Sequence, residues 1–196
     1  MAVIIASFAA VALGIVTASH PQRQTASSRT ATPTVPSSQP PSRQLLPRSA
    51  PVRLTIRAIG VDGGLEHLGL SADKKTMRLP SHPGTAGWFE DGPSPGEVGP
   101  TIIVGYIATQ HGPGVFHRLA RLKAGAKIAV RRADAMVVTY QVDHIATYPP
   151  NKLPPAKVYG RTKQPALRLI TCGGMLGRGR PVGNTVVYAR QVAVGP

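Results

Sequence analysis

Cysteine, acidic residues and aromatic side chains are all scarce in this sequence. It has one cysteine among 196 residues, which excludes a disulfide framework and any cysteine-rich zinc or iron–sulfur site. Eight aspartates and glutamates stand against 23 lysines and arginines, so the net charge is +15. Aromatic residues make up 5%, and the basic residues follow no helical pattern. The chain therefore offers few stacking surfaces for bases, and we do not expect nucleic acid as its partner.

Glycine and proline, by contrast, are abundant. The sequence has 21 glycines and 20 prolines, about twice what a helix-rich protein carries. Apolar residues make up 42%, which is enough for a buried core and excludes a chain that is disordered throughout. These proportions predict a turn-rich β protein with an additional disordered tract. No two histidines or carboxylates recur at the spacing of metal ligands, so we expect no metal and no cofactor.

Residues 1–18 hold the longest apolar run. Ala2–Ala18 contains only apolar or small residues and has about the minimum length for a membrane-spanning helix. We interpret it as a signal anchor of a single-pass membrane protein whose remaining residues lie on the extracellular side. The alternative is a signal peptide that is cleaved after Val16–Ala18. Arg23 and Arg29 follow the run, and no basic residue precedes it. An anchor with an extracellular C-terminal side usually has its basic residues before the apolar run. A chain start further upstream would explain the difference.

Residues 19–50 have a different composition from the rest of the chain. They include 6 prolines, 11 serines and threonines, and no acidic residue. Such a stretch cannot bury enough apolar surface to offset its ordering entropy, so we predict a disordered tether. The remaining domain, 51–196, keeps 19 basic and 8 acidic residues. This excess predicts attraction to anionic lipid headgroups or to an anionic cell wall.

The domain has the two-residue periodicity of β-strands. Val52, Leu54 and Ile56 alternate with polar residues, as in a strand that is buried on one face. Thr101–Ile107 is a short continuous apolar run, which is typical of a strand covered on both faces. Only Gly114–Lys123 has a helical pattern. Further strands are predicted at 126–132 and 135–145, which form a hairpin, and at 166–172 and 184–194. Six to eight strands in a domain of this length predict a small closed barrel, which has no exposed sheet edge.

Cys172 is the first candidate for chemistry. It ends a predicted buried strand, which would hold its side chain in place, and Gly173 and Gly174 follow it. Two glycines let a substrate backbone approach and offer unhindered N–H groups. A thiol of ordinary pKa is mostly protonated at neutral pH and needs a cationic or proton-accepting neighbour to react there. Arg178 and Arg180 lie in the following loop. On these residues alone, Cys172 is equally compatible with a nucleophile and with a buried core thiol.

Several short segments together carry a family resemblance. In chain order they are Arg53–Val61 (RLTIRAIGV), Ala86–Phe89 (AGWF), Gly92–Gly96 (GPSPG), Gly112–Leu119 (GPGVFHRL), Tyr148-Pro149, Val158–Gly160 and Leu167–Gly174 (LRLITCGG). In this order, residues 51–190 resemble the sortases, particularly the class F and more loosely the class E sortases of actinobacteria. The occurrence of all these segments in the same order is far more specific for the family than any single segment.

The resemblance implies both a fold and a reaction. The fold is all-β, a closed sortase-type eight-stranded barrel with one or two short helices and a cleft at one end. Cys172 is implied to be the nucleophile that attacks a sorting-signal peptide, forms a thioacyl-enzyme and transfers the peptide to a cell-wall amine. A histidine acts as general acid and base, and an arginine stabilises the oxyanion. The resemblance also implies that Thr171, Gly173, Tyr148 and Tyr159 border the bound peptide.

Two positions depart from the family pattern. Tyr106 stands where sortases have the catalytic histidine, and a phenol with a pKa near 10 cannot become an imidazolium. The position of the family arginine is Val182, so Arg180, two residues earlier, is the expected substitute. His111, five residues after Tyr106, is the best replacement base, although it is equally compatible with a solvated loop histidine.

Three hypotheses follow from these residues. The first is a membrane-anchored cysteine transpeptidase in which Cys172, Arg180 and either Tyr106 or His111 carry the reaction. The second is a degenerate sortase-like domain that binds peptide or cell wall without efficient turnover. The third is an extracytoplasmic barrel adaptor in which Cys172 serves only for packing.

Overall fold

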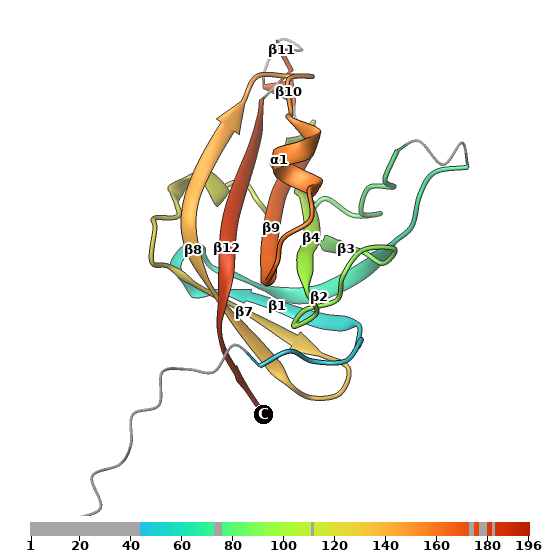
Figure 1. Cartoon of the computed structure of the whole chain (residues 1–196). Helices are drawn as coiled ribbons and strands as arrows, with labels where there is room; N and C mark the ends of the chain where they lie inside the picture. Colours follow the sequence, from blue (N-terminus) through green and yellow to red (C-terminus); the bar gives the residue numbers. More distant parts are fainter. Residues whose placement is uncertain (1–43, 73–75, 111, 173–174, 177–179, 182) are drawn as a thin grey trace, which may run out of the picture. The chain divides into compact units, whose positions relative to one another are not determined.

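The domain is a closed barrel of eight strands (Figure 1). The computed structural model describes residues 44–72, 76–110, 112–172, 175–176, 180–181 and 183–196. Around the barrel the order is β1 (Pro51–Ile56), β2 (Val61–Leu68), β3 (Ala86–Phe89), β4 (Gly99–Tyr106), β9 (Pro165–Cys172), β12 (Asn184–Gly195), β8 (Val137–Tyr148) and β7 (Lys127–Arg132). The all-β class and the closed eight-stranded barrel are therefore confirmed.

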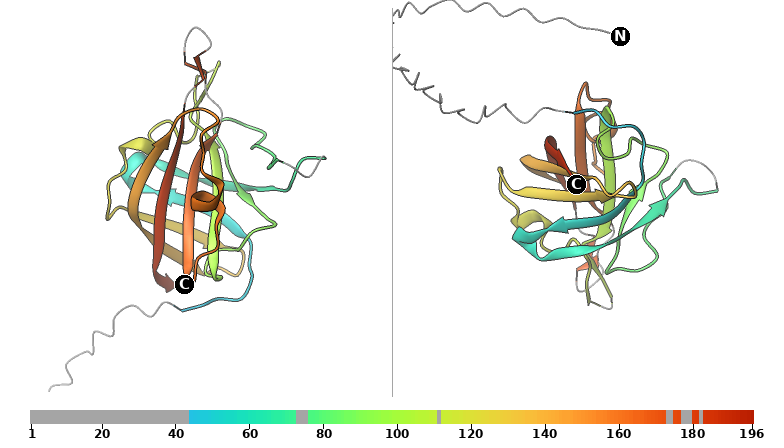
Figure 2. Two further views of the ribbon diagram at one scale, coloured as in Figure 1. Left: turned by 45° about the horizontal axis from the view of Figure 1, so that its top comes forward. Right: turned by 90° about the horizontal axis from the view of Figure 1, so that it is seen from below.

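Smaller elements connect the barrel strands. They are the ribbon of β5 (Ala108–Thr109) and β6 (Gly112–Pro113), the ribbon of β10 (Met175–Leu176) and β11 (Arg180–Pro181), the 3-10 turns η1 (Arg57–Ile59) and η2 (Leu119–Arg121), and the helix α1 (Pro155–Tyr159). The β5–β6 ribbon follows β4, and the β10–β11 ribbon follows β9. Figure 2 shows α1 lying over the outer side of β9.

Apolar side chains cover both faces of β4. Ile103 points into the barrel and belongs to the interior core, whereas Ile102 and Val104 point outward. The outward pair belongs to a second cluster, which we call the outer cluster, together with Ile170 of β9 and Val158 of α1. Side chains of a strand alternate between its faces, so a strand covered on both sides needs a continuous apolar run. The prediction of a doubly covered strand at this position is confirmed.

The first strand departs from simple alternation. Leu54 and Ile56 are buried as predicted, but Val52 is 42% exposed. The register between β1 and β7 shifts between Pro51 and Arg53, as in a β-bulge. A bulge inserts one residue and changes which face the preceding side chains occupy. The sequence pattern therefore predicted the strand correctly but not the outward position of Val52.

The helix predicted at Gly114–Lys123 is wrong. The segment forms turns and only the three-residue η2. The backbone N–H of Phe116 donates to the carbonyl of Tyr106 at 2.9 Å, which ties the start of the segment to the end of β4. Leu119 N–H then donates to the Phe116 carbonyl, three residues back, as in a 3-10 turn. The observed helix α1 begins with Pro155, which is favourable at a first helical position.

Residues 44–50 lie against the barrel, although the sequence assigned them to the tether. The backbone N–H of Leu46 donates to the Gly96 carbonyl at 3.0 Å, and its side chain packs against the interior core. The buried guanidinium of Arg132 donates from Nη2 to the Pro47 carbonyl at 2.8 Å. These contacts satisfy backbone groups that a free tether would leave to water. The domain boundary at this end is therefore better placed before residue 44.

The predicted anchor, 1–18, and most of the tether lie outside the described residues. Within the part of the chain that the structure describes, no helix is both long and apolar enough to cross a membrane. In the same residues, no group of three or more His, Cys, Asp or Glu side chains could hold a metal ion.

Candidate active site

The register between β4 and β9 brings the two main candidate residues together. The strands are parallel neighbours, so their C-terminal ends meet at one edge of the sheet. Tyr106 and Cys172, the last residues of the two strands, are Cα partners. Paired residues of neighbouring strands point to the same face, which here is the outer face that also carries Val104 and Ile170. The thiol and the phenol therefore share one end of the outer cluster.

Cys172 lies in apolar surroundings. Its side chain is half-buried and packs against the outer cluster. Burial disfavours the charged thiolate and raises the pKa of the thiol from its ordinary 9.0 to about 11. No histidine in the described residues is among the groups that alter this pKa. A thiol in this environment is protonated at neutral pH.

Two tyrosines stand near the thiol. Burial raises the pKa of Tyr106, and the nearby Cys172 adds to the rise because two negative charges would repel each other. The same two causes raise the pKa of Tyr159, which is on α1 and is 45% exposed. Both phenols therefore keep their protons at neutral pH. They can donate hydrogen bonds to a carbonyl oxygen, but they cannot accept the thiol proton.

Thr171 and Tyr148 were also expected to border the bound peptide, but they lie on opposite faces of the barrel wall. Thr171 is buried on the face of β9 opposite to Cys172, and its hydroxyl accepts a hydrogen bond from the Thr185 N–H at 2.7 Å. It therefore fixes β9 against β12 and does not line the outer face. Tyr148, at the end of β8, is half-buried in the outer cluster, and its hydroxyl lies 3.0 Å from that of Tyr188. Of these two, only Tyr148 shares the face of Cys172.

The remaining predicted site residues lie wholly or partly outside the described residues. His111 and Gly173 lie outside the described residues, as does Arg178. Arg180 belongs to β11, where it is paired with Leu176 in the ribbon that follows β9, and only its backbone is described. The ribbon of β10 and β11 extends beyond the edge of the barrel at which β9 ends (Figure 1).

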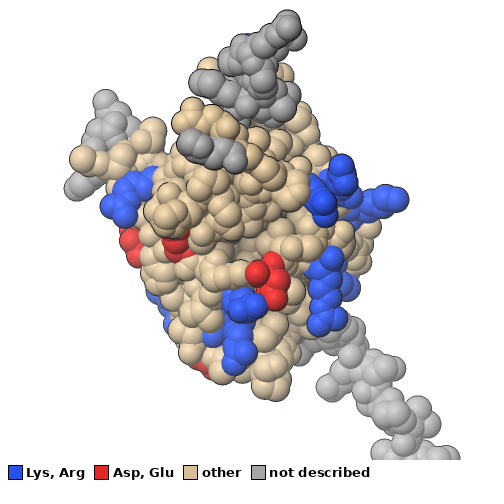
Figure 3. All heavy atoms as spheres, turned by 180° about the vertical axis from the view of Figure 1, so that it is seen from behind, with Lys and Arg blue, Asp and Glu red and all other residues tan. Residues whose placement is uncertain are grey.

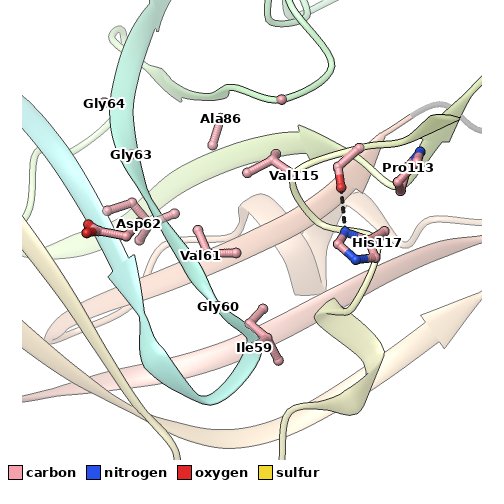
Figure 4. Close-up of a pocket in the computed structure, with 13 residues that line it drawn as sticks. Ile59, Gly60, Val61, Asp62, Gly63, Gly64, Ala86, Pro113, Val115 and His117 are labelled. Atoms are coloured by element: carbon pink, nitrogen blue, oxygen red, sulfur yellow. Dashed lines mark hydrogen bonds between the residues drawn. The ribbon is translucent and has the colours of Figure 1, made fainter. Parts of the chain in front are cut away.

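His117 lines a separate hollow of about 260 Å³ between β2 and the segment 113–117 (Figure 4). Its Nδ1 donates a hydrogen bond to the Gly114 carbonyl at 2.8 Å. Asp62 also lines this hollow but turns its carboxylate away, toward Arg53 (Figure 4). The imidazole is therefore anchored within its own loop.

A second hollow, of about 500 Å³, adjoins the outer face of β4. Phe89, Pro93 and Ile102 contribute apolar lining, and Tyr159 stands beside them at the end of α1. Ile102 precedes Tyr106 by four residues on the same face of β4, which corresponds to about 13 Å along the strand.

The contacts of several residues on the outer face were not predicted from the sequence. Val158 of α1 is fully buried in the outer cluster. Farther from the thiol, the guanidinium of Arg168 lies 4.6 Å from the ring centre of Tyr188, and His144 stacks on the same ring at 4.4 Å. The alternation of inward and outward side chains along the last predicted strand could have placed Tyr188 on this face. No local sequence pattern reveals its partners, His144 on β8 and Arg168 on β9.

A comparison with family models identifies the domain. Residues 54–192 match the sortase domain. The chain belongs to the sortase family. Sortases are generally cysteine transpeptidases, which act on proteins that bear a sorting signal and on amine acceptors. No curated protein sequence matches this sortase closely.

Solved sortases share the fold of this domain. A sortase transpeptidase of Clostridium perfringens is 21% identical, with 74% of this chain and 82% of that chain covered and a TM-score of 0.53. For a lid mutant of Corynebacterium diphtheriae sortase A, the identity is 18%, the coverage 77% and 74%, and the TM-score 0.55. A sortase of Actinomyces oris is 18% identical, with 81% and 89% covered and a TM-score of 0.54. At these identities the likeness establishes the barrel alone.

Proposed function

We propose that this sortase domain transfers acyl groups through Cys172. The sulfur attacks the carbonyl carbon of a peptide bond in a sorting signal, and the bond to nitrogen breaks. The thiol proton leaves with the released amine. An amine of the cell wall then attacks the thioester, restores the peptide bond and returns a proton to the sulfur. The observation that carries this proposal is the shared register position of Tyr106 and Cys172 at the ends of β4 and β9.

Tyr106 and Arg180 take different roles in this proposal. The Tyr106 phenol stays protonated and donates a hydrogen bond to the carbonyl oxygen as negative charge develops on it. Arg180 assists electrostatically, and His111 supplies the proton-accepting group. A site without an imidazole at position 106 should be slower than its relatives by a factor of about 10² to 10⁴. Residues 53–61 and 167–174 support assignment to class F.

The location of the reaction is part of the same proposal. Ala2–Ala18 would anchor the chain in the cell membrane, and the residues up to 43 would hold the barrel on the extracellular side. The partners would then be membrane-proximal proteins with a sorting signal and an amine of the wall. The support is the length and composition of the N-terminal run.

A second candidate function is peptide or cell-wall binding without efficient turnover. One observation favours it: burial raises the pKa of Cys172 to about 11, far above the pKa of an activated thiol. The same outer face and the hollow beside α1 would then bind an extended peptide, and the protonated thiol would not attack it.

Hydroxylaminolysis separates the two functions. The full-length protein is incubated with a library of sorting-motif peptides and hydroxylamine, and the hydroxamate product is measured. Transfer predicts product that is lost in Cys172→Ala. Binding without turnover predicts peptide binding in both proteins and no product. A thioacyl adduct on Cys172, detected by intact mass, would further support transfer, and product formation by Cys172→Ala would contradict it.

A further inference from the structure

Four basic side chains line a hollow on the outer wall formed by β1, β7 and β8. The hollow has a volume of about 450 Å³. Its lining residues are Arg53, Thr55, Arg57, Lys127, Ala129, Arg131, Val137 and Thr139. We call this surface the basic furrow. It lies on strands that do not carry the candidate active site.

The strand register places like charges opposite each other in the basic furrow. Arg53 and Arg131 are Cα partners on β1 and β7. Arg57 directly follows β1, and Lys127 begins β7, so these two cations share the other end of the same antiparallel pair. Like charges directly opposite on neighbouring strands destabilise a sheet. The arrangement therefore lowers stability unless an anion lies between the cations.

The basic furrow is only partly neutralised within the described residues. Asp62 is the nearby carboxylate, and it accepts hydrogen bonds from Arg53 at 2.7 and 2.8 Å. This contact lowers the pKa of Asp62, so its charge is retained at neutral pH. In the described part of the chain, Arg57, Lys127 and Arg131 have no ion pair. Figure 3 shows lysine and arginine side chains at several places on one face of the molecule, with acidic side chains beside some of them.

The spacing of the cations indicates the form of the ligand. Arg53 and Arg57 are four residues apart, which is about 13 Å of strand. A single small anion can contact only one end of the furrow, whereas a chain with repeated negative charges can contact both. The Thr139 hydroxyl lies between the ends and can donate to the same chain, whereas the Thr55 hydroxyl donates to Asp62 at 2.9 Å. Guanidinium groups match the paired free oxygens of a phosphate.

Other anionic partners fit the basic furrow less well. Its lining has no aromatic side chain on which bases of a single-stranded nucleic acid could stack. Because the cations line a concave furrow, a flat lipid surface would contact the side chains at its edge more readily than those deeper inside. We propose that the basic furrow binds a linear phosphodiester polymer, which lies along β1 and β7 and contacts both cation pairs.

The proposal is tested by binding of a fluorescent glycerol-phosphate oligomer of about ten units to the full-length protein in a non-ionic detergent. The variant Arg57→Gln/Lys127→Gln/Arg131→Gln removes three charges from the furrow and leaves the Arg53–Asp62 pair in place. The matched control, Lys157→Gln/Arg161→Gln/Lys163→Gln, removes three exposed charges elsewhere. Thermal melting checks that both variants are folded.

We expect the furrow variant to weaken binding at least about tenfold and to lower the slope of log affinity against log salt by about three. The control should change affinity less than about twofold. Equal losses in both variants, or no oligomer binding at low salt, would overturn the proposal. So would equally tight binding of inorganic phosphate, because one phosphate cannot span both cation pairs.

Parallel measurements identify a wrong choice of partner. The same proteins are tested with a polyglutamate chain, with a single-stranded oligonucleotide, and with vesicles of anionic phospholipid corrected for binding to neutral vesicles. If any of these binds more tightly than the glycerol-phosphate oligomer and depends on the same three residues, the furrow has a different ligand and the proposal fails. None of these results depends on Cys172, so they leave the proposed acyl transfer untouched.

Discussion

Alkylation of Cys172 tests whether burial controls the reactivity of the thiol. The pKa of about 11, in place of the ordinary 9.0, reduces the thiolate fraction near pH 7.5 about 100-fold. Thiolate is the reactive form. Iodoacetamide should therefore modify the folded protein about 100-fold more slowly than the same chain in denaturant. The rate should rise about tenfold for each pH unit until it levels off near pH 11.

The chain has a single cysteine, so intact mass measures this reaction without ambiguity. The pH profile separates two effects that both slow the reaction. Steric shielding of the sulfur lowers the rate by the same factor at every pH, whereas a raised pKa moves the midpoint of the profile. The variant Cys172→Ser should remain unmodified and serves as the control.

A midpoint near or below pH 9 in the folded protein would refute the reasoning. It would mean that a group outside the described residues stabilises the thiolate more strongly than burial destabilises it. His111, Arg178 and Arg180 would then be the residues to replace, one at a time, to find which of them restores a high midpoint.

The other predictions concern the neighbour of the thiol and the stability of the barrel. Tyr106→His should increase hydroxylaminolysis at least about tenfold, because an imidazole can accept the thiol proton, whereas Tyr106→Phe should give no gain. Arg132→Met should lower the free energy of unfolding by about 2–4 kcal/mol in denaturant melts, because it leaves buried carbonyls without a donor. Arg190→Met, which removes an exposed ion pair, should cost less than about 1 kcal/mol. The raised pKa of Cys172 stabilises the fold fully below pH 9, and this contribution is lost as the pH rises through 11. The loss is at most about 3 kcal/mol, and Cys172→Ala should remove this part of the pH dependence.

Elements with strong local patterns could be predicted from the sequence. The apolar run of β4 follows from coverage on both faces, and the alternation in 126–145 predicted the hairpin of β7 and β8. Both patterns reflect burial, which the fold confirms. An α-helix at 114–123 does not form because the later N–H groups of that segment, such as those of Leu119 and Leu122, donate to carbonyls three residues back, as in turns, and the apolar spacing does not reveal this difference.

Features that depend on long-range contacts could not be predicted. Asp134 follows β7 in the turn of the hairpin and pairs with the buried Arg132, whose guanidinium also donates to the carbonyls of Pro47 and Pro95. Nothing near Arg132 in the sequence indicates that residues 44–50 will cover it. The pairing of Tyr106 with Cys172 was likewise accessible only through the family resemblance, because strand register between distant segments has no local signal.

The geometry at the end of β4 separates the packing of the strand from the side chain at position 106. Gly105 points inward, and a Cβ atom there would lie 2.6 Å from Val115 and 2.8 Å from Phe116, so close packing fixes the strand end at this residue. Tyr106 points outward and is only half-buried, so a different side chain can be accommodated. The pairing with Cys172 is therefore set by Gly105 and the backbone register, whereas the side chain at 106 decides which chemical group lies beside the thiol. A histidine at that position should leave the melting temperature nearly unchanged while it changes the rate, and a large loss of stability in Tyr106→His would show that the two are not separable.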